Sequence, residues 1–330
     1  MTKIRRRQRC PECGSLDVIK WGSRGGHQRY KCCSCGAHFT SHREDIKMSN
    51  HFVWFRRWVQ GKQTITDIAK DSGYSERQLR RWFDDYLDTS PAWKVPRQGP
   101  VHMMVDGTWF GNKERCLIVY RNYDTRSTVY YRLAEGENRN EIEKDLATFK
   151  ELGLNIVSFT TDGGDDIVRA IDCIYPKVVR QRCVVHIERE CLTWLTQHPR
   201  TSAGVTLRRL VRKISDIQTN NDRLFWTKEL NRWHNEYEEF LKEKSVNKDT
   251  GEETYLHDSV RRTYVHLRRA IPFMFEYIKH PDVPSNTNSI ESFFGHMKDN
   301  LRIHRGMSQE HQENFIKWYL YFMSDRKNNR

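Results

Sequence analysis

The sequence predicts a multidomain α/β protein, and three observations support this. Two C-x2-C pairs lie near the N-terminus, segments of helical period follow them, and after a proline-rich stretch strands alternate with helices. A chain of 330 residues is long enough for two or three domains. Hydrophobic residues make up 37% of it and aromatic residues 12%, which excludes global disorder.

The positive charge is concentrated in the first part of the chain. The net charge is +13; residues 1–100 carry 20 Lys and Arg against 10 Asp and Glu, and residues 101–330 carry 36 against 33. This distribution is expected if the N-terminal part holds a polyanion such as nucleic acid. A basic but otherwise ordinary soluble surface remains the alternative.

No membrane segment is expected. No apolar run approaches the ~20 residues that span a bilayer, and the opening MTKIRRRQR has no signal-peptide core. We therefore expect a soluble, cytoplasmic protein with no membrane partner. Its nine cysteines then favour thiols and metal ligation over disulfides.

The first element, residues 1–45, reads as a zinc ribbon. Each C-x2-C pair forms a knuckle that aims two sulfurs at one ion, and DVIKWG and HQRYKC between the pairs alternate like two short strands. Cys33 is interpreted as a spectator, and His27 and His38 are less favoured ligands. The expected structural Zn²⁺ ligands are Cys10, Cys13, Cys32 and Cys35.

Residues 46–88 read as a helix-turn-helix. Ser49 is expected to cap a first helix, a second runs over 65–71, and after the turn SGYS a Ser75-x-x-Gln78 capping box begins a third. In such units the last helix reads a DNA groove, and Arg and Gln suit base edges and phosphates. A helical hairpin without DNA remains the alternative. The expected DNA-binding residues are Arg77, Gln78, Arg80 and Arg81, and 89–100 is a linker.

From residue 101 the pattern predicts strands at 101–110, 116–123 and 127–134, a helix at 137–153, a strand at 155–162, a second helix and a strand at 177–183. The order βββαβαβ is that of the ribonuclease-H-like fold. In that fold the first and fourth strands are neighbours, which brings Asp106 and Asp162 to one edge of the sheet. Two carboxylates so placed repel each other unless divalent cations bridge them, so we expect Mg²⁺ or Mn²⁺ there.

A third acidic ligand is expected on the helix that starts near residue 288. Ile290, Phe293, Phe294, Met297 and Leu301 form its buried stripe, and Glu291 lies at the edge of that stripe. Lys298 and Arg302 share the face of Glu291 and are expected to contact DNA phosphates. An ordinary surface glutamate remains the alternative.

The blocks DGTW, TTDGGDD, CVVH and NSIESFFGHMK, in this order, resemble bacterial insertion-sequence transposases of the Mutator-like group, which are DDE enzymes. The zinc ribbon and helix-turn-helix resemble a zinc-containing variant. The resemblance implies Asp106, Asp162 and Glu291 as the catalytic triad. It also implies an all-helical insertion at 187–285, between core segments 101–186 and 286–330. Cys183 and His186 match the family's C-x2-H; they are interpreted as accessory residues that brace the site, and a role of His186 at the scissile phosphate is the alternative.

The function expected from residues and resemblance together is DNA transposition. The triad would hold two Mg²⁺ ions, and the enzyme would nick DNA at the element ends and join the freed 3′-OH to a target. Expected partners are double-stranded DNA, both terminal repeats and target, and further copies of the chain in a homodimer or higher oligomer. The protein would be nucleoid-associated in a bacterial cytoplasm. The alternatives are a DNA-binding regulator with a degenerate core and a ribonuclease-H-like nuclease without strand transfer.

Overall fold

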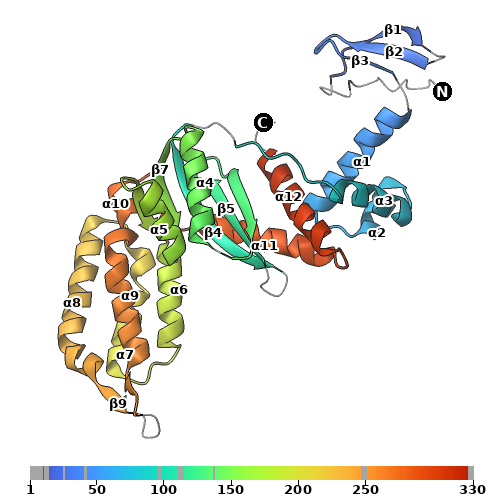
Figure 1. Cartoon of the computed structure of the whole chain (residues 1–330). Helices are drawn as coiled ribbons and strands as arrows, with labels where there is room; N and C mark the ends of the chain where they lie inside the picture. The colour runs from blue at the N-terminus through green and yellow to red at the C-terminus, as the bar shows by residue number, and fades with distance from the viewer. Residues whose placement is uncertain are drawn as a thin grey trace. The chain divides into compact units, whose positions relative to one another are not determined.

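The computed structural model describes residues 10, 15–24, 27–40, 43–95, 99–110, 115–136, 138–246 and 251–325. The chain divides into two compact units (Figure 1). Unit 1 comprises Met1–Ala92 with Met297–Arg330, and unit 2 comprises Trp93–His296. The sequence pattern predicts that 286–330 belongs to the core; in the structure the residues from Met297 onward cluster with the N-terminal helices.

Unit 1 begins with a small antiparallel sheet in the order β1-β2-β3. Its strands are β1 (Val18–Arg24), β2 (His27–Cys32) and β3 (His38–Thr40). Two of these strands were expected; β3 was missed because it has only three residues, too few to show an alternating pattern.

Three helices follow this sheet in unit 1. They are α1 (Arg43–Gln60), α2 (Ile65–Ser72) and α3 (Glu76–Leu87). Thr64 and Asp67 form the capping box of α2, and Gly73 ends that helix with a φ of 74°. The Ser75 side chain accepts a hydrogen bond from the Gln78 amide at the start of α3. Ser49 is not a cap, because α1 begins at Arg43 and passes through it.

The C-terminal helix α12 (Gln309–Asp325) completes the core of unit 1. Trp318 Nε1 donates to the Tyr86 carbonyl at 3.0 Å, and Asn314 Nδ2 donates to the Leu87 carbonyl at 2.7 Å. The Trp318 ring packs edge-on against Phe52 and Phe55 of α1. This aromatic packing explains why the last described helix belongs with α1 and α3.

Unit 2 is built on a five-stranded mixed sheet in the order β6-β5-β4-β7-β8 (Figure 1). The strands are β4 (Val101–Phe110), β5 (Arg115–Asn122), β6 (Thr128–Ala134), β7 (Ile156–Thr161) and β8 (Val179–Arg182). Strands β4, β5 and β6 form an antiparallel meander, and β4, β7 and β8 run parallel. The central strand β4 therefore lies directly beside β7.

Helices cover both faces of this sheet. Helices α4 (Arg139–Glu151) and α5 (Asp165–Ile174) pack against one face, where Met103, Val105 and Phe159 contribute to a shared apolar core. The first half of α11 (Asn288–Ile303) lies on the other face. There Ser289 contacts Met104 Sδ at 3.4 Å, and the Arg121 guanidinium lies over the Phe293 ring. Because side chains alternate along a strand, Asp106 points to the same face as Met104.

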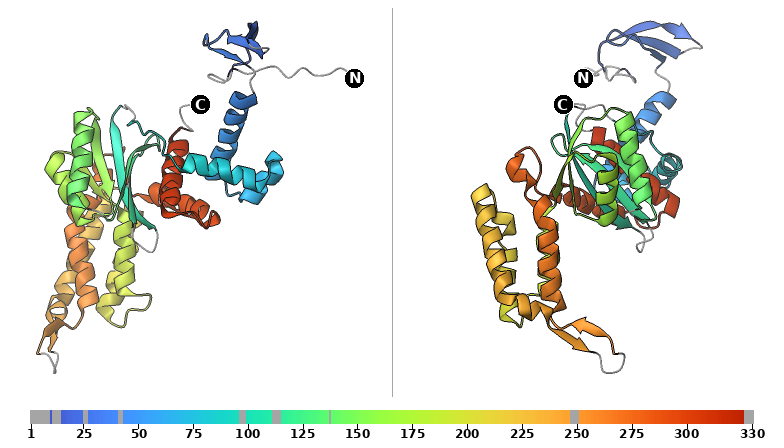
Figure 2. Two further views of the ribbon diagram at one scale, coloured as in Figure 1. Left: turned by 45° about the vertical axis from the view of Figure 1, so that its right-hand side comes forward. Right: turned by 60° about the vertical axis from the view of Figure 1, so that its left-hand side comes forward.

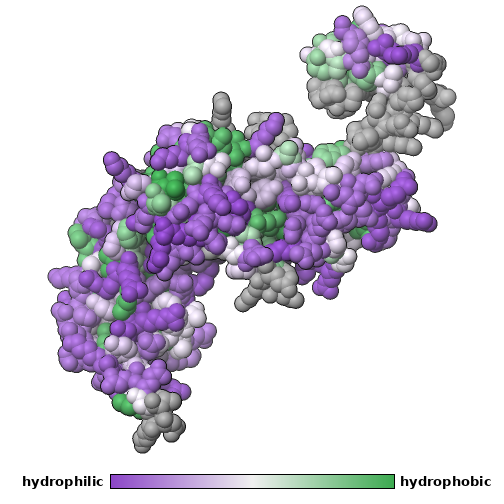
Figure 3. Space-filling model, in the orientation of Figure 1, coloured by the Kyte–Doolittle hydropathy of each residue, from purple (hydrophilic) through white to green (hydrophobic). Residues whose placement is uncertain are grey.

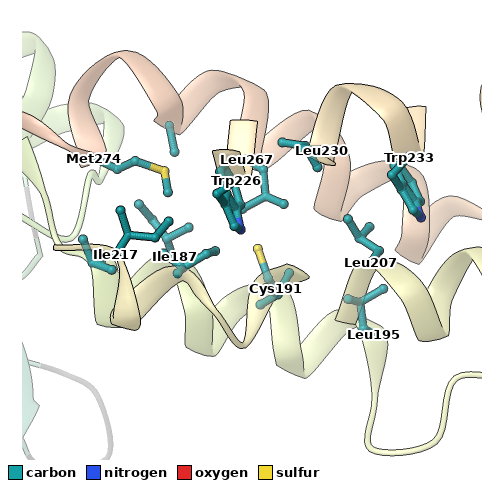
Figure 4. Close-up of a cluster of buried hydrophobic side chains, with 14 of the residues drawn as sticks. Ile187, Cys191, Leu195, Leu207, Ile217, Trp226, Leu230, Trp233, Leu267 and Met274 are labelled. Carbon is teal, nitrogen blue, oxygen red and sulfur yellow. The ribbon is translucent and has the colours of Figure 1, made fainter. Parts of the chain in front are cut away.

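Between β8 and α11 the chain forms a helical layer with its own core. Its main helices are α6 (Val184–Leu195), α7 (Ser202–Val211), α8 (Asn220–Lys242) and α9 (Asp258–Met274), followed by the short α10 (Glu276–Lys279). Figure 4 shows Trp226, Leu230, Trp233 and Leu267 packed against Ile187, Cys191 and Leu207. The expectation of an all-helical insertion is wrong in one detail: β9 (Lys244–Val246) and β10 (Glu253–Tyr255) form an antiparallel hairpin at the far end of α8 and α9 (Figure 2).

The outer surface of these helices contrasts with their interior. Hydrophilic residues dominate the visible face over α8 and α9 (Figure 3). Within the described ranges, no helix combines the length and the apolarity that crossing a membrane requires.

Candidate active site

Asp106 is a buried carboxylate at the centre of the sheet. It is only 6% exposed, and its Oδ1 accepts a hydrogen bond from the Gly107 amide at 2.9 Å. Burial and then the charge of Asp162 raise the pKa of Asp106 to about 7. Buried Asp145 differs, because it pairs with Arg132 and accepts from the Tyr120 hydroxyl. Within the described part of the chain no lysine or arginine pairs with Asp106.

Asp162 follows β7 directly, in a loop of defined geometry. Its Oδ1 accepts a hydrogen bond from the Gly164 amide at 2.9 Å, and the Thr161 hydroxyl accepts one from the Gly163 amide at 3.1 Å. Gly163 has a φ of 91°, in the left-handed region that favours glycine. The loop therefore fixes the Asp162 carboxylate close enough to Asp106 for its charge to disfavour ionisation of Asp106.

Cys183 and His186 lie at the start of α6, where the chain leaves β8. The Cys183 amide donates to the Thr161 carbonyl at 2.7 Å, and Cys183 Sγ accepts from both the amide and the hydroxyl of Thr287, at 3.4 and 3.5 Å. Burial opposes the thiolate, but hydrogen bonds from His186 and Thr287 outweigh it and lower the pKa of Cys183. Cys183 thus links the end of the sheet to the segment that precedes α11.

Glu291 stands in the first turn of α11 and is held by two basic side chains. His186 Nε2 lies 3.2 Å from Glu291 Oε1, and Arg189 Nη1 lies 2.9 Å from Oε1 and 3.0 Å from Oε2. The hydrogen bond with Cys183 raises the pKa of His186 to about 9 against the effect of burial, and nearby negative charges act in the same direction. The raised pKa favours the protonated form of His186, which is the form that can donate from Nε2 to Glu291 while Nδ1 also keeps its proton.

The structure brings three of the expected site residues together. The ligand atoms of Asp106, His186 and Glu291 all lie within 4.8 Å of one another, although the residues come from β4, α6 and α11. Asp162 is not a member of this group, and its influence on Asp106 is electrostatic. Two carboxylates with a third nearby form the oxygen-rich donor set that Mg²⁺ and Mn²⁺ prefer. The residues present therefore fit a divalent cation.

A second candidate metal site lies in the N-terminal sheet. The ligand atoms of Cys10, Cys32 and Cys35 lie within 4.8 Å of one another, and Cys10 Sγ is 3.6 Å from Cys35 Sγ. The fourth expected ligand, Cys13, falls outside the described residues. Cys33 points away into solvent, because it is exposed while its neighbour Cys32 is buried. A cluster of thiols at this spacing is typical of a zinc-binding knuckle.

Of the side chains expected to contact DNA, those on α3 and Arg302 are exposed, and Lys298 is half-buried. Leu79, Trp82, Phe83 and Leu87 of α3 point into the core of unit 1. The opposite face of the same helix carries Arg77, Gln78, Arg80 and Arg81, all exposed. Arg80 forms an i,i+4 ion pair with Glu76 at 3.5 Å. Further along α11, Lys298 is half-buried, and Arg302 is exposed with Asp299 at 3.8 Å.

Two residues of the site were missed by sequence reasoning. Arg189 lies three residues after His186 and meets Glu291 across 102 residues of sequence. Thr287 bonds to Cys183 across 104 residues. Residues three apart on a helix face the same side, so the i,i+3 spacing from His186 could have indicated that Arg189 also faces the site. Nothing in the local pattern singles out Thr287.

Fold and site together define a multidomain α/β protein with a carboxylate cluster suited to a divalent cation. Residues 124–305 match the family model described as "Transposase, Mutator family". The match covers more than half of the chain, and the protein belongs to the Mutator family of transposases. A search of curated proteins gives no match.

Proposed function

We propose that this transposase is a DDE-type enzyme with a ribonuclease-H-like core, which nicks DNA at the ends of its element and transfers the freed 3′ ends to a target. The observation that carries the proposal is the meeting of Asp106 and Glu291, with His186, within 4.8 Å on one face of the sheet. The strand order β6-β5-β4-β7-β8, with β4 beside β7, supports the assignment of the core.

The proposed magnesium ligands are Asp106, Asp162 and Glu291. Divalent cations bound there would supply a polarised oxygen nucleophile and stabilise the leaving 3′ oxygen. Asp106 contributes a buried carboxylate; burial first and the charge of Asp162 second raise its pKa, and a bound cation would favour its ionised form. Cys183 has a positioning role, because its hydrogen bonds from Thr287 hold the start of α11 against the end of β7.

We further propose that unit 1 recognises DNA. Structural Zn²⁺ would be held by Cys10, Cys32 and Cys35 together with Cys13, and α3 would enter the major groove of the terminal repeat. The exposed polar face of α3, opposite its buried stripe, supports this role. Lys298 and Arg302 would contact DNA phosphates, and joining two element ends calls for at least two copies of the chain.

The proposal is tested by strand-transfer assays on a duplex that carries a terminal repeat. Asp106→Asn, Asp162→Asn and Glu291→Gln should each lower nicking and joining at least ~1000-fold, because each leaves a metal short of a ligand. Binding of the duplex should survive in all three. Asp166→Asn is the matched control, because this exposed acid of α5 lies four positions beyond Asp162 and should remain active.

The outcomes separate the alternative functions. Nicking without joining in the unmodified protein would indicate a nuclease. Repeat binding without any nicking would indicate a regulator. If Glu291→Gln remains active while both aspartate variants are inactive, the third metal ligand is a residue other than Glu291.

A further inference from the structure

The Glu291 carboxylate is contacted by the side chains of Arg189 and His186. Arg189 Nη1 reaches both of its oxygens, at 2.9 and 3.0 Å, and His186 Nε2 lies 3.2 Å from Oε1. These are the same oxygens that a metal ligand must present to a cation. Arg189 Nη1 fills the space between the two oxygens, so while this contact lasts a cation has only their outer lone pairs, and the contact opposes coordination of a metal by both oxygens.

Arg189 is placed where a second anion can reach it. Its side chain is 56% exposed, whereas that of Glu291 is 29% exposed. The described residues give the Arg189 side chain no other hydrogen-bond or ion-pair partner. Guanidinium groups bind phosphate with the same forked geometry that they use for carboxylates. Arg189 can therefore exchange Glu291 for a DNA phosphate by turning its side chain, with no change in the backbone of α6.

We propose that Arg189 couples DNA binding to metal binding: its guanidinium occupies the oxygens of Glu291 until a phosphate of bound DNA takes the guanidinium and leaves those oxygens to the metal. This inference rests on the proposed function, because it takes Glu291 as a metal ligand. It makes Arg189 a positioning residue for Glu291, not a catalytic one. By thermodynamic linkage, metal must strengthen DNA binding by the same factor by which DNA strengthens metal binding.

The sign of one measurement separates this role from a purely structural one. If Arg189 only held Glu291 in place for the metal, its removal would weaken metal binding. If Arg189 competes with the metal, its removal strengthens metal binding. The ion pair is partly exposed and runs from a single guanidinium nitrogen to both oxygens, so the expected gain is roughly three- to tenfold.

In the first experiment the full-length chain is titrated with Mn²⁺ in the absence of DNA, and electron paramagnetic resonance measures the concentration of free Mn²⁺. Arg189→Ala should bind Mn²⁺ roughly three- to tenfold more tightly than the unmodified protein. Arg212→Ala is the control for the loss of one positive charge, because Arg212 is exposed at the end of α7 and does not contact the site. Circular dichroism spectra establish that both variants are folded.

The second experiment measures the reciprocal effect by fluorescence anisotropy of a labelled terminal-repeat duplex, in EDTA and in Ca²⁺. Ca²⁺ should tighten duplex binding by the unmodified protein roughly three- to tenfold and by Arg189→Ala less than about twofold. A smaller or reversed effect of Arg189→Ala in the first experiment, or equal Ca²⁺ effects in the second, would overturn the coupling.

The same experiments distinguish failure of this inference from failure of the proposed function. Glu291→Gln is titrated with Mn²⁺ in parallel. If Glu291→Gln binds Mn²⁺ as well as the unmodified protein does, Glu291 is not a metal ligand and the proposed site itself is wrong. If Glu291→Gln binds weakly while Arg189→Ala gains nothing, the site stands and the coupling role of Arg189 is wrong.

Discussion

The backbone of Gly163 lies directly against the side chain of Arg182. A Cβ added at position 163 would lie 2.2 Å from Arg182 Nε and 2.8 Å from its Cζ. This glycine also has a φ of 91° and directly follows Asp162. The positive φ disfavours any side chain at this position, and an added Cβ would in addition require the Arg182 side chain to move.

We expect Gly163→Ala to displace the loop that carries Asp162. The variant should lose about 1–3 kcal/mol of stability and at least ~10-fold in nicking rate. Gly153→Ala is the matched control, because Gly153 has a φ of 70° but nothing within 4 Å of an added Cβ. It should lose stability and keep its activity. Thermal unfolding and nicking assays measure both; full activity in Gly163→Ala would show that the loop tolerates displacement.

We expect Asp106→Asn to stabilise the metal-free protein at neutral pH. The pKa of Asp106 in the folded chain is about 7, above its ordinary value of 3.8, so the folded state binds more protons between these values. Stability therefore falls as pH rises through this window, by on the order of 1–4 kcal/mol from this group. Urea unfolding of both proteins from pH 4 to pH 8, with EDTA, should show the difference growing with pH. A difference in unfolding free energy that stays constant from pH 4 to pH 8 would contradict a raised pKa of Asp106.

We expect zinc to depend on Cys32 and not on Cys33. Cys32 is buried within the thiol cluster, whereas Cys33 is exposed beside it. The full-length protein should release about one Zn²⁺ per chain after thiol modification, as a four-thiolate site requires. Cys32→Ser should release less than about a tenth of this amount, and Cys33→Ser should match the unmodified protein. If both variants lost the same amount of Zn²⁺, Cys33 would be a zinc ligand as well as Cys32.

We expect Trp318→Ala to unfold unit 1 at lower denaturant concentration. Trp318 is 9% exposed and packs against Phe52, Phe55 and Phe322. Removal of its ring leaves a cavity and should cost about 3–5 kcal/mol. Trp109→Ala, at a position 41% exposed, should cost less than about 1 kcal/mol. Urea unfolding followed by circular dichroism compares the two; equal costs would mean that α12 does not stabilise unit 1.

The sequence predicts which segments form strands and helices better than it predicts which of these elements pack together. The strands of the core show β-period or continuous apolar patterns, so their order along the chain could be predicted directly. The hairpin β9–β10 could not, because each strand has three residues and both are mostly exposed, which leaves no apolar alternation. The apolar stripe of α12 indicates that the helix is buried, but a stripe does not specify which surface covers it.

The candidate site shows the same limit. Helical period locates Glu291 at the edge of a buried stripe, but its approach to Asp106 depends on the sheet face that α11 meets after the long insertion. The ion pair between Arg189 and Glu291 joins residues with no local relation in sequence. Side chains that meet across such distances are specified by tertiary packing, which a single sequence does not reveal.

The division of unit 1 between the two ends of the chain has a consequence for synthesis. A ribosome makes α1 and α3 early, but α12, which covers Phe52 and Phe55, is made only after the whole of unit 2. Until then the aromatic face of the early helices lacks its native cover. A nascent or prematurely terminated chain therefore carries an unfinished unit 1, and the helices proposed to hold DNA become fully packed only once unit 2 has been translated.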